Sequence, residues 1–221
     1  MSTPSRPGIR SQPTAERVAA APPSLTSGSP AILQRLRSET RHAHDTIERA
    51  LDLLNPALTL ATYRRRIEQL HGYYQPVEHR LSHVGDWREI GLNLEERRKL
   101  PLIETDLAAL GSVRPSDLPT CDRLPRLGSV ASAFGCLYVL EGASLGGQVI
   151  SRHVQAALGV TTERGGRFFH GYGPRTGAMW QEFSRAITDL ASTRQIADTV
   201  LAAAVETFET LRQWLEKTGE R

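Results

Sequence analysis

The helical spacing of apolar residues is the feature of this sequence that most limits its possible folds. Between the pairs Ser29-Pro30 and Asn55-Pro56, apolar side chains recur every three or four residues. They are Ile32, Leu33, Leu36, Ala43, Ile47, Ala50, Leu51 and Leu54. This spacing places them on one face of an α-helix, and a proline is well suited to the first helical position. No segment alternates apolar and polar residues as a strand would. The sequence therefore predicts an all-α fold.

Capping and turn signals divide the rest of the chain into further helices. The expected helices span about residues 59–83, 93–111, 127–158, 176–190 and 193–217. Pro101 should interrupt the second of these, because proline lacks the N–H that a helix interior needs. Ser192 and Gln195 form a capping-box pattern at the start of the last one. Prolines in 112–125 and glycines in 159–175 predict loops.

Length and composition indicate one soluble globular domain with a tail. The chain has 221 residues, of which 39% are hydrophobic and 23% charged. Residues 1–28 are rich in Ser, Pro, Thr, Ala and Arg and show no sustained periodicity. Such a segment buries too little apolar surface to offset the entropy of ordering it. We therefore expect a disordered tail over 1–28 and a single domain over 29–221.

Charge and cysteine content exclude several function classes. The formal net charge is only +3, and part of it lies in the tail, so we expect no nucleic-acid groove. The two cysteines, Cys121 and Cys136, form no CxxC motif, which favours reduced thiols in the cytoplasm. No apolar run approaches the roughly 20 residues of a membrane span, and the N-terminus lacks the apolar core of a signal peptide. The sequence predicts a cytoplasmic protein without a membrane span.

Two histidines of the first helix differ in their angular positions. With about 100° per residue, His44 falls roughly 70° from the centre of the apolar stripe, whereas His42 lies roughly 130° away on the other side. His42 should therefore face water. His44 could reach a ligand with one ring nitrogen while Glu48, one turn later, holds the other. Arg37 lies on the same flank, where it could meet a ligand carboxylate. Periodicity alone leaves open that His44 is a packed, hydrogen-bonded residue.

The stretch EGASLGG (141–147) is the second informative segment. Glycine costs about 1 kcal/mol relative to alanine inside a helix, so Gly142, Gly146 and Gly147 need a reason. They could break and kink the helix and let a flat ligand approach its backbone, or they could serve tight helix packing. A phosphate loop is excluded because the GK[ST] ending and a preceding strand are missing. Glu141 is interpreted as a helix-surface carboxylate.

Together these two segments resemble one known family. LRSETRHAHDTIE (36–48) resembles the proximal helix of heme oxygenases, with a Thr four residues before His44 and a Glu four residues after it. YVLEGASLGGQVI (138–150) resembles the distal helix of the bacterial branch. The similarity extends over about residues 30–217. The motifs, in this order and at these separations, resemble a biliverdin-producing heme oxygenase of the phytochrome-associated branch, with an all-helical domain that holds heme between the two helices.

The resemblance implies a role for several residues. His44 would be the axial ligand of the heme iron, and Gly142 and Gly146 would line the distal face. Arg37, Tyr138 and Arg185 sit where the family contacts the heme propionates. The expected set of further heme-binding residues is Arg37, Glu48, Tyr138, Gly147, Arg185 and Phe208.

The resemblance also implies a reaction. Heme would be both cofactor and substrate, and dioxygen with electrons from a ferredoxin or a flavoprotein reductase would convert it to biliverdin, CO and Fe²⁺. Biliverdin could supply a bacterial phytochrome, or iron release could be the purpose. One position departs from the family: many members place an Asp where this chain has Ala143. Backbone carbonyls freed by a kink at Gly142 would then have to hold the distal water network.

Two alternatives remain at this point. A heme carrier or sensor on the same fold would use the same binding residues. A four-helix di-iron carboxylate protein would use two Glu-x-x-His motifs, which the chain has at Glu39–His42 and Glu68–His71. That site needs all its ligands to point inward, whereas His42 is expected to point outward.

Overall fold

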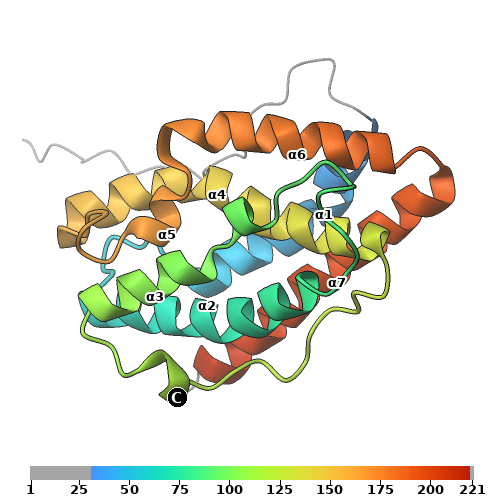
Figure 1. The fold of residues 1–221 in the computed structure, drawn as a ribbon. Helices are drawn as coiled ribbons and strands as arrows, with labels where there is room; N and C mark the ends of the chain where they lie inside the picture. Colours follow the sequence, from blue (N-terminus) through green and yellow to red (C-terminus); the bar gives the residue numbers. More distant parts are fainter. Residues whose placement is uncertain (1–30, 220–221) are drawn as a thin grey trace, which may run out of the picture.

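The computed structural model describes residues 31–219, and within that range the protein is helical and contains no strand (Figure 1). Its α-helices are α1 (Ala31–Leu51), α2 (Leu60–Leu81), α3 (Leu100–Ala109), α4 (Val130–Leu158), α5 (Arg167–His170), α6 (Thr176–Leu190) and α7 (Arg194–Gly219). Three short 3₁₀ helices are η1 (Glu95–Arg97), η2 (Pro115–Asp117) and η3 (Gly173–Arg175). The all-α prediction is confirmed. The expected tail 1–28 and the Ser29-Pro30 start signal lie outside the described residues.

Helix α4 is the centre of the molecule. In Figure 1 it runs between α6 on one side and the pair α2 and α3 on the other, and it packs most extensively against α7. A capping box of Ser129 and Ser132 begins it, and Gly159, with a φ of 67°, ends it. The two helices approach closely at Gly135, where a Cβ atom would lie 2.8 Å from the Cβ of Ala203. Only glycine permits this crossing.

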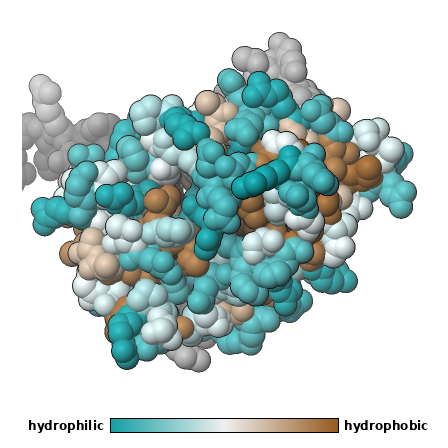
Figure 2. All heavy atoms as spheres, viewed as in Figure 1, coloured by the Kyte–Doolittle hydropathy of each residue, from teal (hydrophilic) through white to brown (hydrophobic). Residues whose placement is uncertain are grey.

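The apolar character of α4 follows from its place in the core. By length and mean hydropathy it is the one helix among residues 31–219 that could cross a membrane. Sixty-one per cent of its most apolar window is buried inside the protein, and a core helix satisfies the same criteria. The outer face seen in Figure 2 is mostly hydrophilic, with apolar side chains visible in limited areas. Cys121 and Cys136 are both buried free thiols, as expected.

Two interruptions predicted from the sequence take a different form. Pro101 lies in the first turn of α3, where a backbone N–H would have no acceptor within the helix. The proline is therefore tolerated at the start of this helix and does not interrupt it. The helix expected from residue 93 begins only at Leu100, and the side-chain amide of Asn93 donates to Glu96 Oε1 at 2.8 Å. The glycines of EGASLGG do not break α4, which is continuous from Val130 to Leu158.

Two connections also differ from expectation. The predicted loop 159–175 contains α5 and η3. At the start of α5 the Asp106 carboxylate accepts hydrogen bonds of 2.8 Å from the backbone N–H groups of both Arg167 and Phe168. Phe168 and its neighbour then enter the core. At the start of α7 the predicted capping box of Ser192 and Gln195 is replaced by Thr193, whose hydroxyl accepts from the N–H of Ile196 at 3.3 Å.

The glycines of α4 give a direct test of the α4–α7 crossing. Gly135→Ala should lower the free energy of unfolding by about 1–3 kcal/mol, because the new methyl group collides with α7. Gly142→Ala is the matched control on the same helix: nothing lies within 4 Å of its Cβ, so stability should stay the same or rise by up to about 1 kcal/mol. Urea unfolding followed by circular dichroism measures both, and equal stability of the two variants would contradict the close crossing.

Candidate functional site

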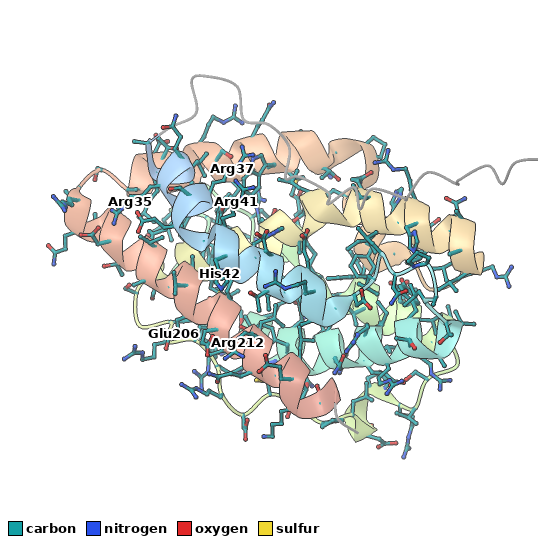
Figure 3. All side chains as sticks on the ribbon, turned by 180° about the vertical axis from the view of Figure 1, so that it is seen from behind. Arg35, Arg37, Arg41, His42, Glu206 and Arg212 are labelled. Carbon is teal, nitrogen blue, oxygen red and sulfur yellow. The ribbon has the colours of Figure 1, made fainter. Side chains whose placement is uncertain are left out.

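The structure separates the two histidines of α1 as their angular positions predict. His42 is exposed, and Figure 3 shows it on the outer side of α1. His44 is partly buried, with 36% of its side chain exposed. The ring of Phe208, which is buried on α7, meets the His44 ring edge-on at a centroid distance of 6.2 Å. His44 therefore lies at the border of the core, where one edge of its ring remains accessible.

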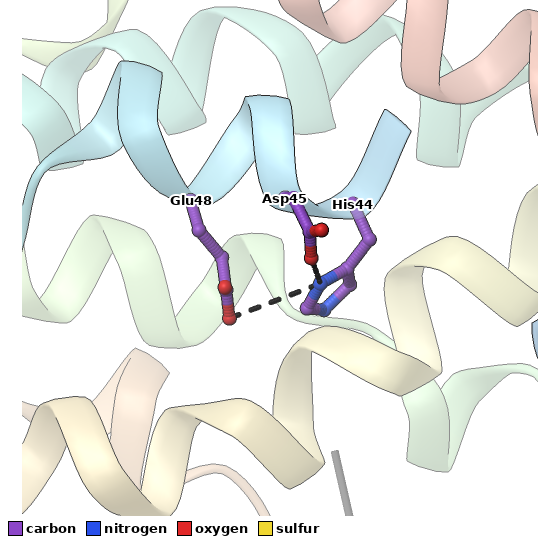
Figure 4. Close-up of side chains that lie close together, drawn as sticks. All are labelled: His44, Asp45 and Glu48. Carbon is purple, nitrogen blue, oxygen red and sulfur yellow. Dashed lines mark ion pairs between the residues drawn. The ribbon is translucent and has the colours of Figure 1, made fainter. Parts of the chain in front are cut away.

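Two carboxylates face the same nitrogen of His44. The distance from Nδ1 is 3.8 Å to Glu48 Oε1 and 3.9 Å to Asp45 Oδ1 (Figure 4). Burial raises the pKa of Glu48, and the nearby Asp45 charge adds to this while His44 opposes it. Since both acceptors lie on the Nδ1 side, Nε2 is the ring nitrogen left for a ligand. Asp45 was not singled out from the sequence.

Arg37 and Tyr138 come together where α1 meets α4. Thr40 and Arg37, both on α1, are close enough to act on the phenol of Tyr138. Burial raises the pKa of Tyr138, while Thr40 and the positive charge of Arg37 oppose that shift. The ring of Trp180, from α6, lies 6.0 Å from the Tyr138 ring. The sequence predicted Arg37 and Tyr138 as a pair but gave no reason to include Trp180.

The three glycines of EGASLGG have different surroundings. Gly142 and Gly146 are half-buried, and a Cβ atom on either would meet nothing within 4 Å. This part of α4 thus presents bare backbone to open space. Gly147 is buried, and a Cβ there would lie 2.6 Å from the carbonyl oxygen of Phe169 in α5. The bare backbone of Gly147 thus serves packing against α5, and its predicted contact with heme stays a prediction.

Glu141 is not the surface carboxylate expected from the sequence. It is 2% exposed and accepts hydrogen bonds from three side chains: Arg97 at 2.8 Å, Lys99 at 3.3 Å and Tyr172 at 2.6 Å. These partners come from segments far apart in the chain, so helical periodicity could not reveal them. The sequence held one signal of this burial. The charged residue Glu141 directly follows the apolar residues Val139 and Leu140, and a charge in such a place needs partners.

The di-iron alternative is contradicted by the placement of its ligands. Glu39 is exposed and paired with Arg35 at 2.7 Å, and His42 is exposed beside it on α1. Among residues 31–219 only one group of three His, Cys, Asp or Glu side chains has its ligand atoms within 4.8 Å of one another. That group is His44, Asp45 and Glu48, and it contains no residue of either Glu-x-x-His motif.

Arg185 is exposed on α6, and its predicted contact with a ligand stays a prediction. The other predicted ligand-contacting residues, apart from Gly147, lie on α1, α4 and α7, with His44 beside Phe208 and Arg37 near Tyr138. His44 and Glu48 come from α1, Phe208 comes from α7, and Tyr138 comes from α4. Together these residues provide a histidine with one free nitrogen, bare helix backbone and an Arg–Tyr pair. A flat anionic ligand with a metal at its centre would meet a suitable group at each of these places.

Three solved structures of similar shape are heme oxygenases. That of Neisseria meningitidis, with NO and CO bound, gives a TM-score of 0.72 at 22% identity and covers 85% of this chain and 91% of that one. The heme complex of the enzyme from the cyanobacterium Synechocystis gives 0.66 at 17% identity, covering 84% and 91%. That of Leptospira interrogans gives 0.65 at 19% identity, covering 85% and 99%. At these identities the likeness shows a shared fold.

Sequence comparison gives the family. A curated heme oxygenase from Xanthomonas campestris is 34% identical over 93 residues, which are 41% of this chain and 52% of the relative. The chain thus matches about half the length of that relative. The heme oxygenase family model matches residues 31–217, nearly the whole described range. The chain therefore belongs to the heme oxygenase family.

Proposed function

We propose that this protein binds heme between α1 and α4 and cleaves the ring oxidatively with dioxygen. The observation that carries the proposal is the pairing of His44, whose Nε2 is left for a ligand, with the open backbone at Gly142 and Gly146. A flat macrocycle can approach a helix backbone closely where Cβ atoms are missing, and the iron at its centre can be bound by a neutral imidazole. Family membership and the heme-bound Synechocystis neighbour support the same assignment.

The residues of α1 would hold the proximal side. His44 would bind the iron through Nε2, while the carboxylates of Glu48 and Asp45 lie 3.8 and 3.9 Å from Nδ1, where their negative charge would favour a proton on that nitrogen. Phe208 packs against the imidazole from α7 and would cover the porphyrin beside it. This arrangement would leave the opposite side of the heme to α4.

Arg37 and Tyr138 would hold the propionates at the edge of the site. The two side chains already lie close enough for the charge of Arg37 to act on the phenol. A guanidinium and a hydroxyl offer complementary donors to a carboxylate, and Arg185 from α6 could add a second cation. Near the surface such contacts orient a ligand more than they stabilise it.

The distal side would depend on backbone atoms. Ala143 is exposed and its side chain cannot hydrogen-bond a water, so no carboxylate replaces the acid found in many relatives. Because α4 is unbroken, its carbonyl groups keep their helical partners and can offer a water only a second lone pair. The glycines would exclude bulky groups and leave room for dioxygen and ordered water.

Heme, when bound, supplies both the iron that activates dioxygen and the carbon that is oxidised. The chain contributes binding, orientation and exclusion of bulk water. The products would be biliverdin, CO and Fe²⁺, with electrons from a ferredoxin or flavoprotein reductase in the cytoplasm. We favour supply of biliverdin to a bacterial phytochrome over iron release, which extends the phytochrome-associated resemblance of the sequence.

A catalyst and a carrier can be separated in one experiment. The protein is loaded with heme, supplied with ascorbate or a reduced ferredoxin in air, and followed by absorption. A heme oxygenase should lose its Soret band and yield biliverdin, which chromatography identifies with its isomer. A heme carrier or sensor keeps the Soret band, and this outcome would overturn the proposed activity while leaving heme binding intact.

The two histidines of α1 form a matched pair of variants. His44→Ala should lose the spectrum of histidine-ligated heme and normal turnover, because no other imidazole occupies that position. His42→Ala should leave both nearly unchanged, since His42 faces water. Heme titration followed by absorption tests the pair. The reverse pattern would show that the assignment of the axial ligand is wrong.

Arg37 can be compared with Arg41, an exposed arginine one turn later on α1. Arg37→Ala should weaken heme binding by about fivefold or less, the effect of one partly exposed ion pair, and should alter the biliverdin isomer ratio. Arg41→Ala should change neither. If Arg37→Ala leaves both affinity and isomer ratio unmoved, Arg37 does not contact a propionate.

The glycine face is tested by adding a side chain to it. Gly146→Leu should keep heme bound to His44 but slow biliverdin formation by about tenfold or more, because about 1.4 kcal/mol of added barrier suffices for that change. Gly177→Leu is the control: Gly177 is an exposed glycine of α6, also without atoms within 4 Å of a Cβ. A full biliverdin yield from Gly146→Leu would mean that this part of α4 does not cover the reactive face.

A further inference from the structure

We propose that Glu141 is a positioning residue, which holds α4 at the rotation that turns Gly142 and Gly146 toward the ligand and thereby sets where the ring is opened. It acts with Arg97, Lys99 and Tyr172, together called the Glu141 cluster. The inference rests on the proposed function, because regiospecificity has meaning only for a ring-opening enzyme. It assigns a role to buried charges that no ligand contact explains.

The Glu141 cluster is built from short contacts between buried or half-buried side chains. Oε2 of Glu141 accepts from Arg97 Nη1 at 2.8 Å, and Oε1 accepts from the Tyr172 hydroxyl at 2.6 Å and from Lys99 Nζ at 3.3 Å. The Lys99 ammonium also lies 3.7 Å from the centre of the Tyr172 ring. The side chains of Glu141, Arg97 and Lys99 are at most 2% exposed. Burial at this depth makes such hydrogen bonds directional and costly to break.

The Glu141 cluster joins α4 to α6 and to the segments just before α3 and η3. Arg97 precedes α3, and its guanidinium also donates to the carbonyl oxygen of Met179 at 3.2 Å and pairs with Glu182 at 3.3 Å, both on α6. Tyr172 lies just before η3. Glu141 is therefore the point where α4 is joined to α6, to the start of α3 and to the segment after α5.

Neighbouring contacts hold the same side of α4. The Gln148 amide donates to the His170 carbonyl at 3.3 Å and to Thr176 Oγ1 at 3.4 Å. Gly147 packs against the backbone of Phe169. In contrast, Gly142 and Gly146 meet nothing within 4 Å of a Cβ. One side of this stretch is fixed by contacts, and the other side is open.

Helix geometry connects the fixed side to the open one. Glu141 and Gly142 are adjacent, so their side-chain directions differ by about 100°, and the carboxylate cannot reach into the open space itself. It can, however, resist rotation of the helix. With Cα atoms about 2.3 Å from the axis, a rotation of roughly 20° moves a glycine Cα by about 0.8 Å. A displacement of about 1 Å at a reacting centre is enough to change relative rates strongly.

Tyr172→Phe is the sharpest test, because it removes the 2.6 Å hydrogen bond and keeps the ring on which Lys99 rests. The heme-loaded variant should change the biliverdin isomer ratio by about threefold or more and shift the midpoint of the ferric spectrum in a pH titration. Glu141→Gln should move both readouts in the same direction and further, because it also removes the charge opposite Arg97 and Lys99.

Tyr73→Phe is the matched control. The Tyr73 hydroxyl is also buried and bonded, to the Thr207 carbonyl at 3.0 Å and to Thr210 at 2.8 Å, but it joins α2 to α7. It should lower the melting temperature as Tyr172→Phe does, yet leave the isomer ratio and the ferric titration unchanged. Unchanged isomers and titration in Tyr172→Phe would overturn the proposal, whether or not Glu141→Gln folds. A wild-type protein that forms no biliverdin would instead overturn the proposed function.

Discussion

The close crossing of α4 and α7 is the constraint on which the rest of the structure depends. At Gly135 the two backbones approach so closely that a Cβ atom would lie 2.9 Å from the backbone nitrogen of Ala204. One turn beyond this crossing, α4 carries Tyr138 and α7 carries Phe208, which meets His44. The candidate site begins within one turn of the crossing on both helices. Any change in the separation of α4 and α7 would therefore move the residues of the site.

Local periodicity was sufficient for much of the fold and part of the site. The all-α architecture, the outward direction of His42 and the shared face of Gly142 and Gly146 follow from side-chain spacing along single helices, and the structure agrees with each. The pairing of Arg37 with Tyr138 came from the family resemblance, since they lie on different helices. Spacing within one helix says nothing about which other helix it meets.

Several features that the sequence did not reveal depend on contacts between distant segments. At the start of the short helix α5, Asp106, about sixty residues earlier, accepts two of its backbone N–H groups. Glu141 looked like a surface residue because its three donors belong to other segments. Gly147 could not be told from Gly146 by composition, and only the position of Phe169 gives it a different role.

The glycines of α4 show that one residue type serves two opposite needs in a single helix. Gly135 and Gly147 let other backbones come close, which is a packing function, while Gly142 and Gly146 keep space empty. Empty space on one side of a helix contributes no packing energy there, so the helix must be held from its other sides. The buried charges around Glu141 and the contact of Gly147 with α5 provide that hold. The open ligand face of α4 therefore depends on the buried ion cluster that holds the helix from its other side.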